Sequence, residues 1–506
     1  MDADITNRRI HLRKEPKLDA KLQAFSYQTE AVSAIRDLQY AAIFHEQGLG
    51  KTKIALDLIL YWLEKRAVDT VLLVVKKSLI ANWLREIKLH TFLSVRQVGQ
   101  DRRANFYTFN SPARLIVTHY EAVVSEKERF ILFLKTRNVG VILDEAAKIK
   151  TPDSLVTSTF FELALLFTKR VIMTGTPVAN RPYDIWAQIW FLDQGKSLGS
   201  NFEEFRRNAD LTNDMHDDVP AQMRLERQLG LIKEKLTEFC VRETKSNGVI
   251  TLPDKVIESV PATWETRQYE LYRQMRDEMR GVIVKEGVPR EDNTEAILKR
   301  LLRLVQIASN PGIIDDSYAG IPGKMEVLKD LVDRIRSAGE KAIIWSSFTE
   351  NVDWLAREFK GHGTCRVHGK ITIDERNRSL DRFMTDDDFR LLIATPGAAK
   401  EGLTLTIANH VIFYDRSFSL DDYLQAQDRI HRISQKRTCY VHNLIMEDSI
   451  DEWVDVLLQS KHLAAQYAQG DISAAFYRSQ MSYEFGDILR QVLGIKEDKK
   501  ENNDEC

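Results

Sequence analysis

The sequence predicts an α/β protein with two lobes, each built on a parallel sheet, and with helical insertions between and within the lobes. Short apolar runs alternate with helix-like stretches in both halves of the 506-residue chain. Near-continuous apolar strands that alternate with helices are typical of parallel sheets covered on both faces. The length allows roughly three domains by the usual size of a domain, and 43% hydrophobic residues suffice for ordinary globular cores.

The expected strands are short apolar runs that end in polar or small residues. In the first half they lie at 40–44, 71–75, 115–118, 141–143 and 171–173, with helix-like stretches such as 52–66 and 79–89 between them. The second half repeats the scheme at 342–345, 391–394, 411–414 and 440–445. Between the halves, at 200–320, charged helical sequence dominates, as in 223–240 and 266–285. This change from apolar runs to charged, helix-like sequence predicts helical insertions and the connection between the lobes.

These features suggest the domain boundaries. We expect an N-terminal tail at 1–20, a first lobe at 21–200, a helical insertion and lobe connection at 201–257, a second lobe at 258–460 with a helical insertion at 266–320, C-terminal helices at 461–495 and a disordered tail at 496–506. Asn247-Gly248 marks a loop at 246–252. The tail is charged and lacks apolar residues, which is typical of disorder.

Composition excludes several classes of protein. The formal net charge is −2, so nucleic-acid contacts would need local basic patches. The four cysteines (Cys240, Cys365, Cys439 and Cys506) show no CxxC spacing, which argues against a zinc ribbon and favours a reducing compartment. No apolar run approaches the ~20 residues of a membrane span, and the N-terminus lacks a signal-peptide pattern. We therefore expect a soluble, intracellular, cytoplasmic protein.

The segment HEQGLGKT at 45–52, below called the phosphate loop, follows a strand and opens a helix. Glycines let backbone N–H groups approach phosphate oxygens, and the helix N-terminus adds partial positive charge. In such loops Lys51 would reach the β- and γ-phosphates and Thr52 would bind magnesium. His45 replaces the first glycine of the strict pattern, so a glycine-rich turn that merely caps a helix is the alternative.

Asp144 and Glu145 follow an apolar strand directly. At that place Asp144 would hold magnesium through water, and Glu145 would orient or deprotonate the attacking water. The alternative is a strand end whose two carboxylates begin a helix.

The segment QAQDRIHRISQ at 425–435, below called the arginine segment, spaces Gln425, Arg429 and Arg432 four and three residues apart. This spacing predicts one helix face. Arginine grips phosphate oxygens with a fork of donors, so an ATPase shared across a cleft between two lobes is indicated. The alternative is a solvated basic face with arginine–carboxylate pairs, for example to Asp428.

Together these segments resemble the Swi/Snf-type ATPases of helicase superfamily two, across about 20–460. The resemblance rests on an ordered set of motifs: FSYQ (25–28), HEQGLGKT, VLLVVKKSLIANWLREI (71–87), IVTHYE (116–121), DEAAKIK (144–150), TGTP (174–177), CVRETKSNGVITLPDK (240–255), LLRLVQIASNP (301–311), IIWSSF (343–348), EGLTLTIANHVIFYD (401–415) and QAQDRIHRISQ. The last is the most specific. The size is more like minimal bacterial or viral members than chromatin remodellers.

The resemblance implies two RecA-like lobes, the cofactors ATP and Mg²⁺, and ATP-driven translocation on double-stranded DNA that remodels DNA or protein–DNA complexes. It assigns catalysis to Lys51, Asp144, Glu145, Arg429 and Arg432, and magnesium to Thr52 and Asp144. It assigns nucleotide binding to Gln28, Glu46, Gly48, Leu49, Gly50, Lys51, Thr52, Gly402, Gln425, Arg429 and Arg432. The expected DNA contacts are Lys76, Lys77, Ser78, Thr118, Ser347 and Thr404. The alternative is that these are ordinary polar residues at the ends of strands.

Two departures from the family pattern leave other functions open. Ala147 stands where relatives often carry His or Gln, which puts the coupling of hydrolysis to movement in doubt, and Phe25 stands where they often carry arginine. The alternatives are a strand-separating helicase and a nucleotide-gated DNA-binding subunit that recruits a partner such as a nuclease. Partners from DNA repair or phage defence fit, and we expect a monomeric motor without membrane association.

Overall fold

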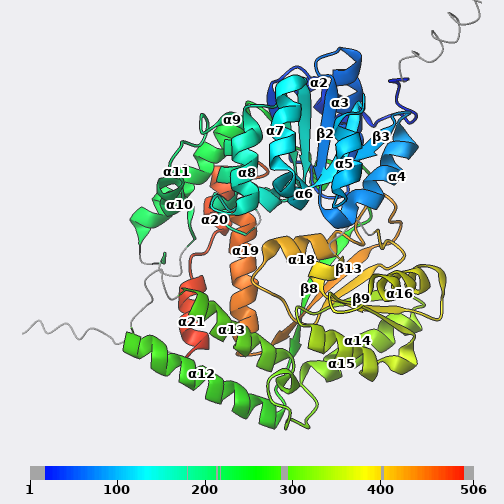
Figure 1. Ribbon diagram of the computed structural model, residues 1–506. Coiled ribbons are helices and arrows are strands. Elements are labelled where there is room, and N and C mark those ends of the chain that lie inside the picture. The colour runs from blue at the N-terminus through cyan, green and yellow to red at the C-terminus, as the bar shows by residue number, and fades with distance from the viewer. Residues whose placement is uncertain are drawn as a thin grey trace, which may run out of the picture. The chain divides into compact units, whose positions relative to one another are not determined.

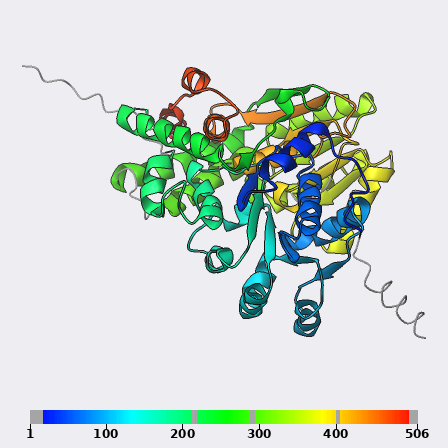
Figure 2. The ribbon, with the colours of Figure 1, turned by 90° about the horizontal axis from the view of Figure 1, so that it is seen from above.

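The computed structural model describes residues 17–178, 180–211, 215–216, 218–286, 294–399 and 404–494. The chain forms two compact units, coloured mainly blue to cyan and yellow to red in Figures 1 and 2. The first unit consists of Met1–Val178, Tyr183–Arg207 and Leu231–Val249, and the second of Ala179–Pro182, Asn208–Gly230 and Ile250–Cys506. The domain boundaries expected from the sequence stay a prediction, and the expected tail at 496–506 lies outside the described residues.

The first unit contains a seven-stranded parallel sheet in the order β3-β4-β2-β5-β6-β1-β7. Its strands are β1 (Tyr40–Ile43), β2 (Thr70–Val75), β3 (Val95–Gln97), β4 (Leu115–His119), β5 (Val139–Asp144), β6 (Lys169–Met173) and β7 (Cys240–Val241). The five strands predicted in this half are confirmed. The other two, β3 and β7, are edge strands of three and two residues, too short to show an apolar run.

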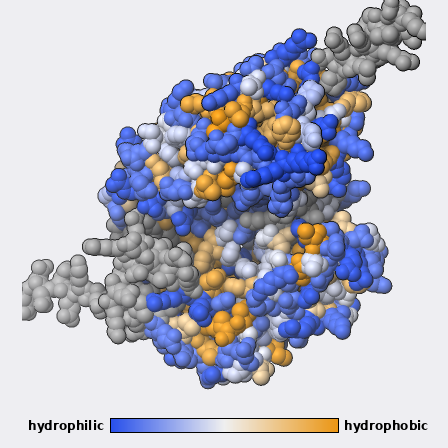
Figure 3. Space-filling view, in the orientation of Figure 1, coloured by the Kyte–Doolittle hydropathy of each residue, from blue (hydrophilic) through white to orange (hydrophobic). Residues whose placement is uncertain are grey.

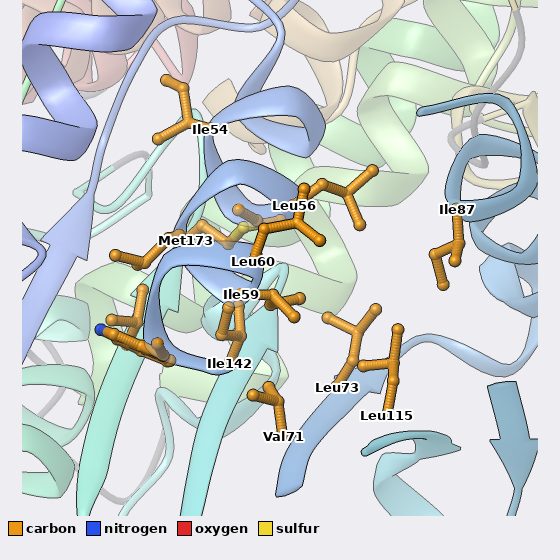
Figure 4. Packing of buried hydrophobic residues seen from close by; sticks show 14 of the residues in the cluster. Ile54, Leu56, Ile59, Leu60, Val71, Leu73, Ile87, Leu115, Ile142 and Met173 are labelled. Atoms are coloured by element: carbon orange, nitrogen blue, oxygen red, sulfur yellow. The ribbon is translucent and has the colours of Figure 1, made fainter. Parts of the chain in front are cut away.

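Helices cover both faces of this sheet because alternate strand residues point to opposite faces. Ile43, Leu73, Ile142 and their equivalents pack against α2 (Ser26–Ile35), α3 (Lys51–Glu64) and α4 (Ile80–His90), as Figure 4 shows for α3 and Ile87 of α4. On the other face, α6 (Tyr120–Ser125) lies against β4, and α9 (Ile185–Asp193) lies against β6 and β1. The remaining helices up to the connection are α5 (Arg102–Phe109), α7 (Lys127–Thr136), α8 (Leu155–Ala164), α10 (Phe202–Ala209) and α11 (Val219–Leu236).

The second unit contains a six-stranded parallel sheet in the order β10-β11-β9-β12-β13-β8. Its strands are β8 (Lys255–Ala262), β9 (Ala342–Trp345), β10 (Thr364–Val367), β11 (Leu391–Ala394), β12 (His410–Phe413) and β13 (Cys439–Met446). Two parallel sheets within one chain confirm the predicted α/β class. The four strands predicted in this half are confirmed, but the sequence did not predict the two edge strands, β8 and β10. Strand β8 pairs with β13 along its whole length.

Helices also flank the second sheet. On one face α14 (Lys324–Ser337) and α15 (Thr349–Glu358) pack on Ala342, Ile344 and Ile412. On the other face α16 (Ile373–Thr385) and α18 (Leu420–Gln427) pack on Ile343 and Val411. This alternation of core residues along β9 and β12 is the same as in the first unit.

A separate apolar cluster joins the helical insertion to the C-terminal helices of the second unit. It contains residues of α12 (Thr266–Glu286), α13 (Thr294–Ser309), α19 (Ile450–Gln469) and α21 (Phe485–Val492), and α17 (Pro396–Ala399) and α20 (Ala474–Gln480) lie outside it. The fully buried Lys324 links this cluster to the sheet, because its ammonium lies 2.5 Å from Asp451 and donates to the carbonyl of Tyr414. The helix predicted at 223–240 is too long: α11 ends at Leu236, and Cys240 belongs to β7.

The visible surface is mainly hydrophilic, with scattered hydrophobic patches (Figure 3). Among the described residues, no helix combines the length and the apolar character that crossing a membrane requires.

Candidate functional site

The phosphate loop connects the end of β1 to the start of α3, as predicted. Gly48 and Gly50 adopt left-handed backbone angles, with φ of +88° and +73°. The positive φ favours glycine at position 50, and a Cβ there would lie 2.3 Å from Nε2 of Gln28 and displace that amide. The first turn of any helix has N–H groups without intrahelical acceptors, and Gly50 provides no side-chain cap for α3. This cradle fits an anionic group.

Lys51 is the first residue of α3, and its ammonium lies over the phosphate loop. Its Nζ donates to the carbonyl of His45 at 2.9 Å and to that of Glu46 at 3.4 Å. Phosphate oxygens in the cradle would replace these two carbonyls as acceptors. Thr52, the next residue, is half-buried in the same helical turn.

Helix α2 is tied to the phosphate loop through Gln28. Nε2 of Gln28 donates to the carbonyl of Leu49 at 3.2 Å, and Oε1 accepts from the backbone N–H of Phe25 at 3.0 Å. The hydroxyl of Tyr27 donates to the same Leu49 carbonyl. Gln28 and Leu49 are both buried, so in this structure Gln28 holds the loop, and Leu49 contributes only its main chain. Phe25 is 52% exposed and stacks on Tyr27.

His45 is a buried, neutral histidine in the phosphate loop. Its ring stacks on Tyr27, with the ring centroids 6.1 Å apart. Burial lowers the pKa of His45 to about 4, and the positive charge of Lys51 acts in the same direction. The residue that breaks the strict loop pattern therefore adds no charge to the loop at neutral pH.

Asp144 ends β5 with its carboxylate buried. Oδ2 accepts the indole N–H of Trp83 at 2.7 Å, and the main-chain carbonyl accepts the hydroxyl of Tyr120 at 2.7 Å. Burial raises the pKa of Asp144 to about 6, with Glu145 acting in the same direction, while Trp83 and Lys51 oppose the shift. Trp83 was not predicted as a site residue. It lies on the apolar face of α4 with Ile80 and Ile87, where periodicity alone indicates a core residue.

Glu145 has a left-handed backbone, with φ of +53°, which is uncommon for a residue other than glycine. Its Oε1 accepts from Nε2 of Gln47 at 3.4 Å. The Gln47 side chain also covers Gly175 of the TGTP segment, where an added Cβ would lie 2.8 Å from Cγ of Gln47. Gln47 therefore contacts both the acidic pair and the TGTP segment, a role that the sequence did not indicate. Ala147 follows in the short helix η2 (Ala146–Ile149).

The first unit thus brings the cradle, Lys51 and the acidic pair together. The Asp144 carboxylate and the Thr52 hydroxyl are hard oxygen donors of the kind that Mg²⁺ prefers, so these side chains fit the expected metal.

The arginine segment corrects a prediction. The expected helix with Gln425, Arg429 and Arg432 on one face ends at Gln427, so Arg429 lies in a turn and Arg432 in a bend. The side chains take the acceptors that a helix would use: Nε of Arg429 donates to the carbonyl of Gln425, and Nε of Arg432 to that of Asp428. Nε2 of Gln435 donates to the carbonyls of Ile430 and Ala408, which fixes the turn.

The other predicted nucleotide contacts of the second unit are placed as follows. Gln425 is buried, and its Nε2 donates to Asp421 at 2.7 Å. Nη1 of Arg432 donates to the hydroxyl of Thr404 at 3.0 Å. Gly402 lies outside the described residues.

The predicted DNA contacts differ in exposure. Lys76 follows β2 and is half-buried, and Lys77 and Ser78 begin the short helix η1 (Lys77–Leu79) with exposed side chains. Thr118 is a correction: it is fully buried in β4 and its hydroxyl donates to the carbonyl of Val98, so it does not contact DNA directly in this structure.

The two predicted DNA contacts of the second unit, Ser347 and Thr404, both have partners inside the protein. The backbone N–H of Ser347 donates to the buried Asp415 at 2.7 Å, and the residue is half-buried. Thr404 is exposed and accepts from Arg432.

Comparison with known proteins places this chain among helicase-like proteins. It is 29% identical over 446 residues to YwqA of Bacillus subtilis (strain 168), covering 83% of this chain and 45% of the relative. It is 25% identical over 431 residues to an ISWI chromatin-remodeling complex ATPase of Saccharomyces cerevisiae, covering 80% of this chain and 37% of the relative. The chain spans less than half the length of the curated relatives that it matches.

Among solved structures, the chain is similar to the Sulfolobus solfataricus SWI2/SNF2 ATPase core in complex with dsDNA. The identity is 23% and the TM-score 0.42, and the match covers 94% of this chain and 98% of that chain. Family models match at residues 27–313, described as the SNF2-related domain, and at residues 323–434, described as the helicase conserved C-terminal domain. Because the first model alone spans more than half of the sequence, the chain belongs to the SNF2-related family.

Proposed function

We propose that this chain hydrolyses ATP to ADP and phosphate with Mg²⁺ and uses the energy to move along double-stranded DNA. The observation that carries the proposal is the arrangement in the first unit. Lys51 lies over a glycine cradle at a helix N-terminus, and its charge acts on the buried carboxylate of Asp144. The name of the yeast relative, an ATPase of a chromatin-remodeling complex, supports the same reaction.

The residues of the first unit would divide the work as follows. The Lys51 ammonium exchanges the carbonyls of His45 and Glu46 for phosphate oxygens. Asp144 and Thr52 would hold Mg²⁺, which neutralises phosphate charge when bound. Glu145 orients the attacking water and accepts its proton, because its left-handed backbone and Gln47 fix the direction of its carboxylate.

We assign Arg429 and Arg432 of the second unit to the stabilisation of charge on the transferred phosphoryl group. A fixed guanidinium stabilises such charge without reorganisation, and each of these arginines has its Nε held by a carbonyl four residues earlier.

DNA as the track rests on the family and on a small number of exposed groups. Lys77 and Ser78 present side chains beside the half-buried Lys76, as contacts to a phosphate backbone require. Such contacts are largely independent of base sequence and weaken as salt rises. With a net charge of −2, the chain has no general attraction to DNA, so these local groups would dominate the salt dependence.

The test is steady-state ATP turnover with duplex DNA, single-stranded DNA and RNA, beside triplex-displacement and strand-displacement assays. We expect duplex DNA to stimulate turnover most, and triplex displacement without strand separation. Equal stimulation by RNA would reject the DNA track, and strand separation would favour the helicase alternative.

Two variants test the assigned residues directly. Lys51→Ala should abolish turnover, and Glu145→Gln should retain nucleotide binding while hydrolysis is lost. If neither the wild type nor a DNA-bound form turns over ATP, the chain is instead a nucleotide-gated binding subunit.

A further inference from the structure

The lobe connection lies beside the phosphate loop as an additional strand. Backbone N–H groups of Ala42, Phe44 and Glu46 donate in turn to the carbonyls of Phe239, Val241 and Glu243, at 3.0, 2.9 and 2.9 Å. The pairing therefore continues beyond the end of β1 and into the phosphate loop. This half of the loop is held by the connection, whereas the half that contains Gly48 and Gly50 is held by its own turn and by α2.

Three side chains strengthen this pairing, and we call Glu46, Arg242 and Lys245 the connection latch. The Glu46 carboxylate accepts the backbone N–H of Lys245 at 2.9 Å, and its other oxygen lies 3.4 Å from the Lys245 ammonium. Nη1 of Arg242 donates to the carbonyl of Phe44 at 2.5 Å. The Lys245 side chain is only 7% exposed, so its charge depends on Glu46 more than a surface lysine would depend on its partner.

Glu46 belongs to two sets of bonds at once. Its carbonyl accepts from Lys51, the residue that would grip phosphate, while its N–H and its carboxylate hold Glu243 and Lys245 of the connection. A few residues after Lys245 the chain passes from the first unit, which ends at Val249, into the second, which resumes at Ile250. The residue whose carbonyl loses a donor when Lys51 turns toward phosphate is therefore the residue that holds the chain where it leaves the first unit.

We propose that the connection latch reports nucleotide binding at the phosphate loop to the lobe connection, with Lys245 as a positioning residue. The proposal rests on the proposed function, because it needs a nucleotide phosphate to draw Lys51 away from the Glu46 carbonyl. Glu46 then adjusts, and the hydrogen bond and the ion pair between its carboxylate and Lys245 carry the adjustment into 243–249. Lys245 does not need to touch the nucleotide for this role.

The test is amide hydrogen exchange of the full chain with and without ADP and magnesium, read from peptides that cover 46–52 and 243–249. In the wild type we expect nucleotide to slow exchange over 46–52 and to change exchange over 243–249 by about threefold. In Lys245→Met the first response should persist and the second should become clearly smaller, because the ion pair to Glu46 is lost while the backbone hydrogen bond remains. Lys245→Gln keeps a polar side chain without the charge, and it serves if the Met variant fails to fold.

Lys235→Met is the matched control, since Lys235 lies in α11 with a side chain 36% exposed and only a 3.9 Å contact to Glu238. The control should respond like the wild type. Turnover gives a second readout: Lys245→Met should keep its DNA-free rate and its KM for ATP, while the DNA-stimulated kcat falls about tenfold.

The possible results separate the two proposals. Protection over 46–52 without any change over 243–249 in the wild type would overturn the latch alone. A response over 243–249 that is as large in both Lys245 variants as in the wild type would also overturn the latch. No protection over 46–52 in the wild type would refute the proposed function and the latch together.

Discussion

The phosphate loop of the first unit and the arginine segment of the second both hold cationic side chains on main-chain carbonyls. Lys51 donates to carbonyls five and six residues earlier, across a loop that needs two left-handed glycines. Arg429 and Arg432 each donate through Nε to a carbonyl four residues earlier, within a compact turn. The acceptors are alike, but the groups that they hold differ in reach and stiffness.

The reach and stiffness of each side chain decide how its positive charge can act. The lysine ammonium is one compact group, so a phosphate in the cradle competes with the two carbonyls for its three N–H donors. An arginine can keep its Nε bond and still present the other nitrogens of its planar fork. We therefore expect the hydrogen bonds of Lys51 in the phosphate loop to change on nucleotide binding. The Nε hydrogen bonds of the arginine segment should stay as they are.

The largest effect should come from Arg432→Ala. Loss of a phosphoryl-stabilising arginine lowers kcat by about 10³–10⁵, or about 4–7 kcal/mol of barrier. Single-turnover hydrolysis with duplex DNA measures it, and nucleotide affinity should change little. Arg437→Ala is the control, because this half-exposed arginine donates to the carbonyl of Ile407. A loss below about tenfold in Arg432→Ala would show that the arginine segment is only structural.

His45 should make the stability of the phosphate loop depend on pH. Its pKa of about 4 in the folded protein lies below the 6.5 of a free histidine, so this stability is fully present above pH 6.5 and is lost as pH falls toward 4. The difference corresponds to about 3 kcal/mol.

Urea unfolding at pH 7.5 and pH 5 measures this effect of His45. His45→Asn should reduce the pH dependence. Equal pH dependence in the wild type and His45→Asn would mean that His45 is not the residue that lowers the free energy of unfolding in acid.

Trp83→Phe tests whether Asp144, the proposed magnesium ligand, is positioned from α4. A hydrogen bond to a charged group contributes about 1.5–3 kcal/mol, so we expect about a tenfold higher Mg²⁺ requirement. Mg²⁺ titration of turnover and Mn²⁺ binding by electron paramagnetic resonance provide independent measurements. Trp62→Phe is matched to it, because Trp62 is equally buried and donates to the carbonyl of Arg36 instead. The same shift in both variants would assign the effect to packing.

The smallest effect should come from the contact of Gln47 with Glu145 and Gly175. Gln47→Met removes the donor, and Gly175→Ala displaces the amide, so each should lower kcat by about fivefold, or about 1 kcal/mol. Gly99→Ala is the control, since its added Cβ would meet only Gln97, at 3.9 Å.

The double variant gives the decisive comparison for Gln47. If the two changes act on one contact, Gln47→Met with Gly175→Ala should lose little more than either single variant. Multiplicative losses would show that Gln47 and Gly175 act separately.

The sequence predicted the central strands of both sheets because they are buried on both faces and therefore apolar throughout. It did not predict the edge strands β10 and β8 of the second sheet. The first five residues of β8 are exposed, and the strand includes Pro261. An edge strand needs no apolar run, and its pairing with β13 depends on residues about 180 positions away. The spacing of residues in the arginine segment predicts a helix. The side chains of Arg429 and Arg432, however, donate to the backbone carbonyls that a helix would use.

By itself the sequence determined which residues carry charge and where the phosphate loop begins, because Gly50, Lys51 and Thr52 are contiguous and their geometry is local. Only the tertiary structure decided which neighbours hold those groups. Trp83 meets Asp144 across 61 residues, Gln47 meets Glu145 across 98, and Lys245 meets Glu46 across 199. These bonds form where strands far apart in the chain end at the same edge of a sheet, and no local pattern records that meeting.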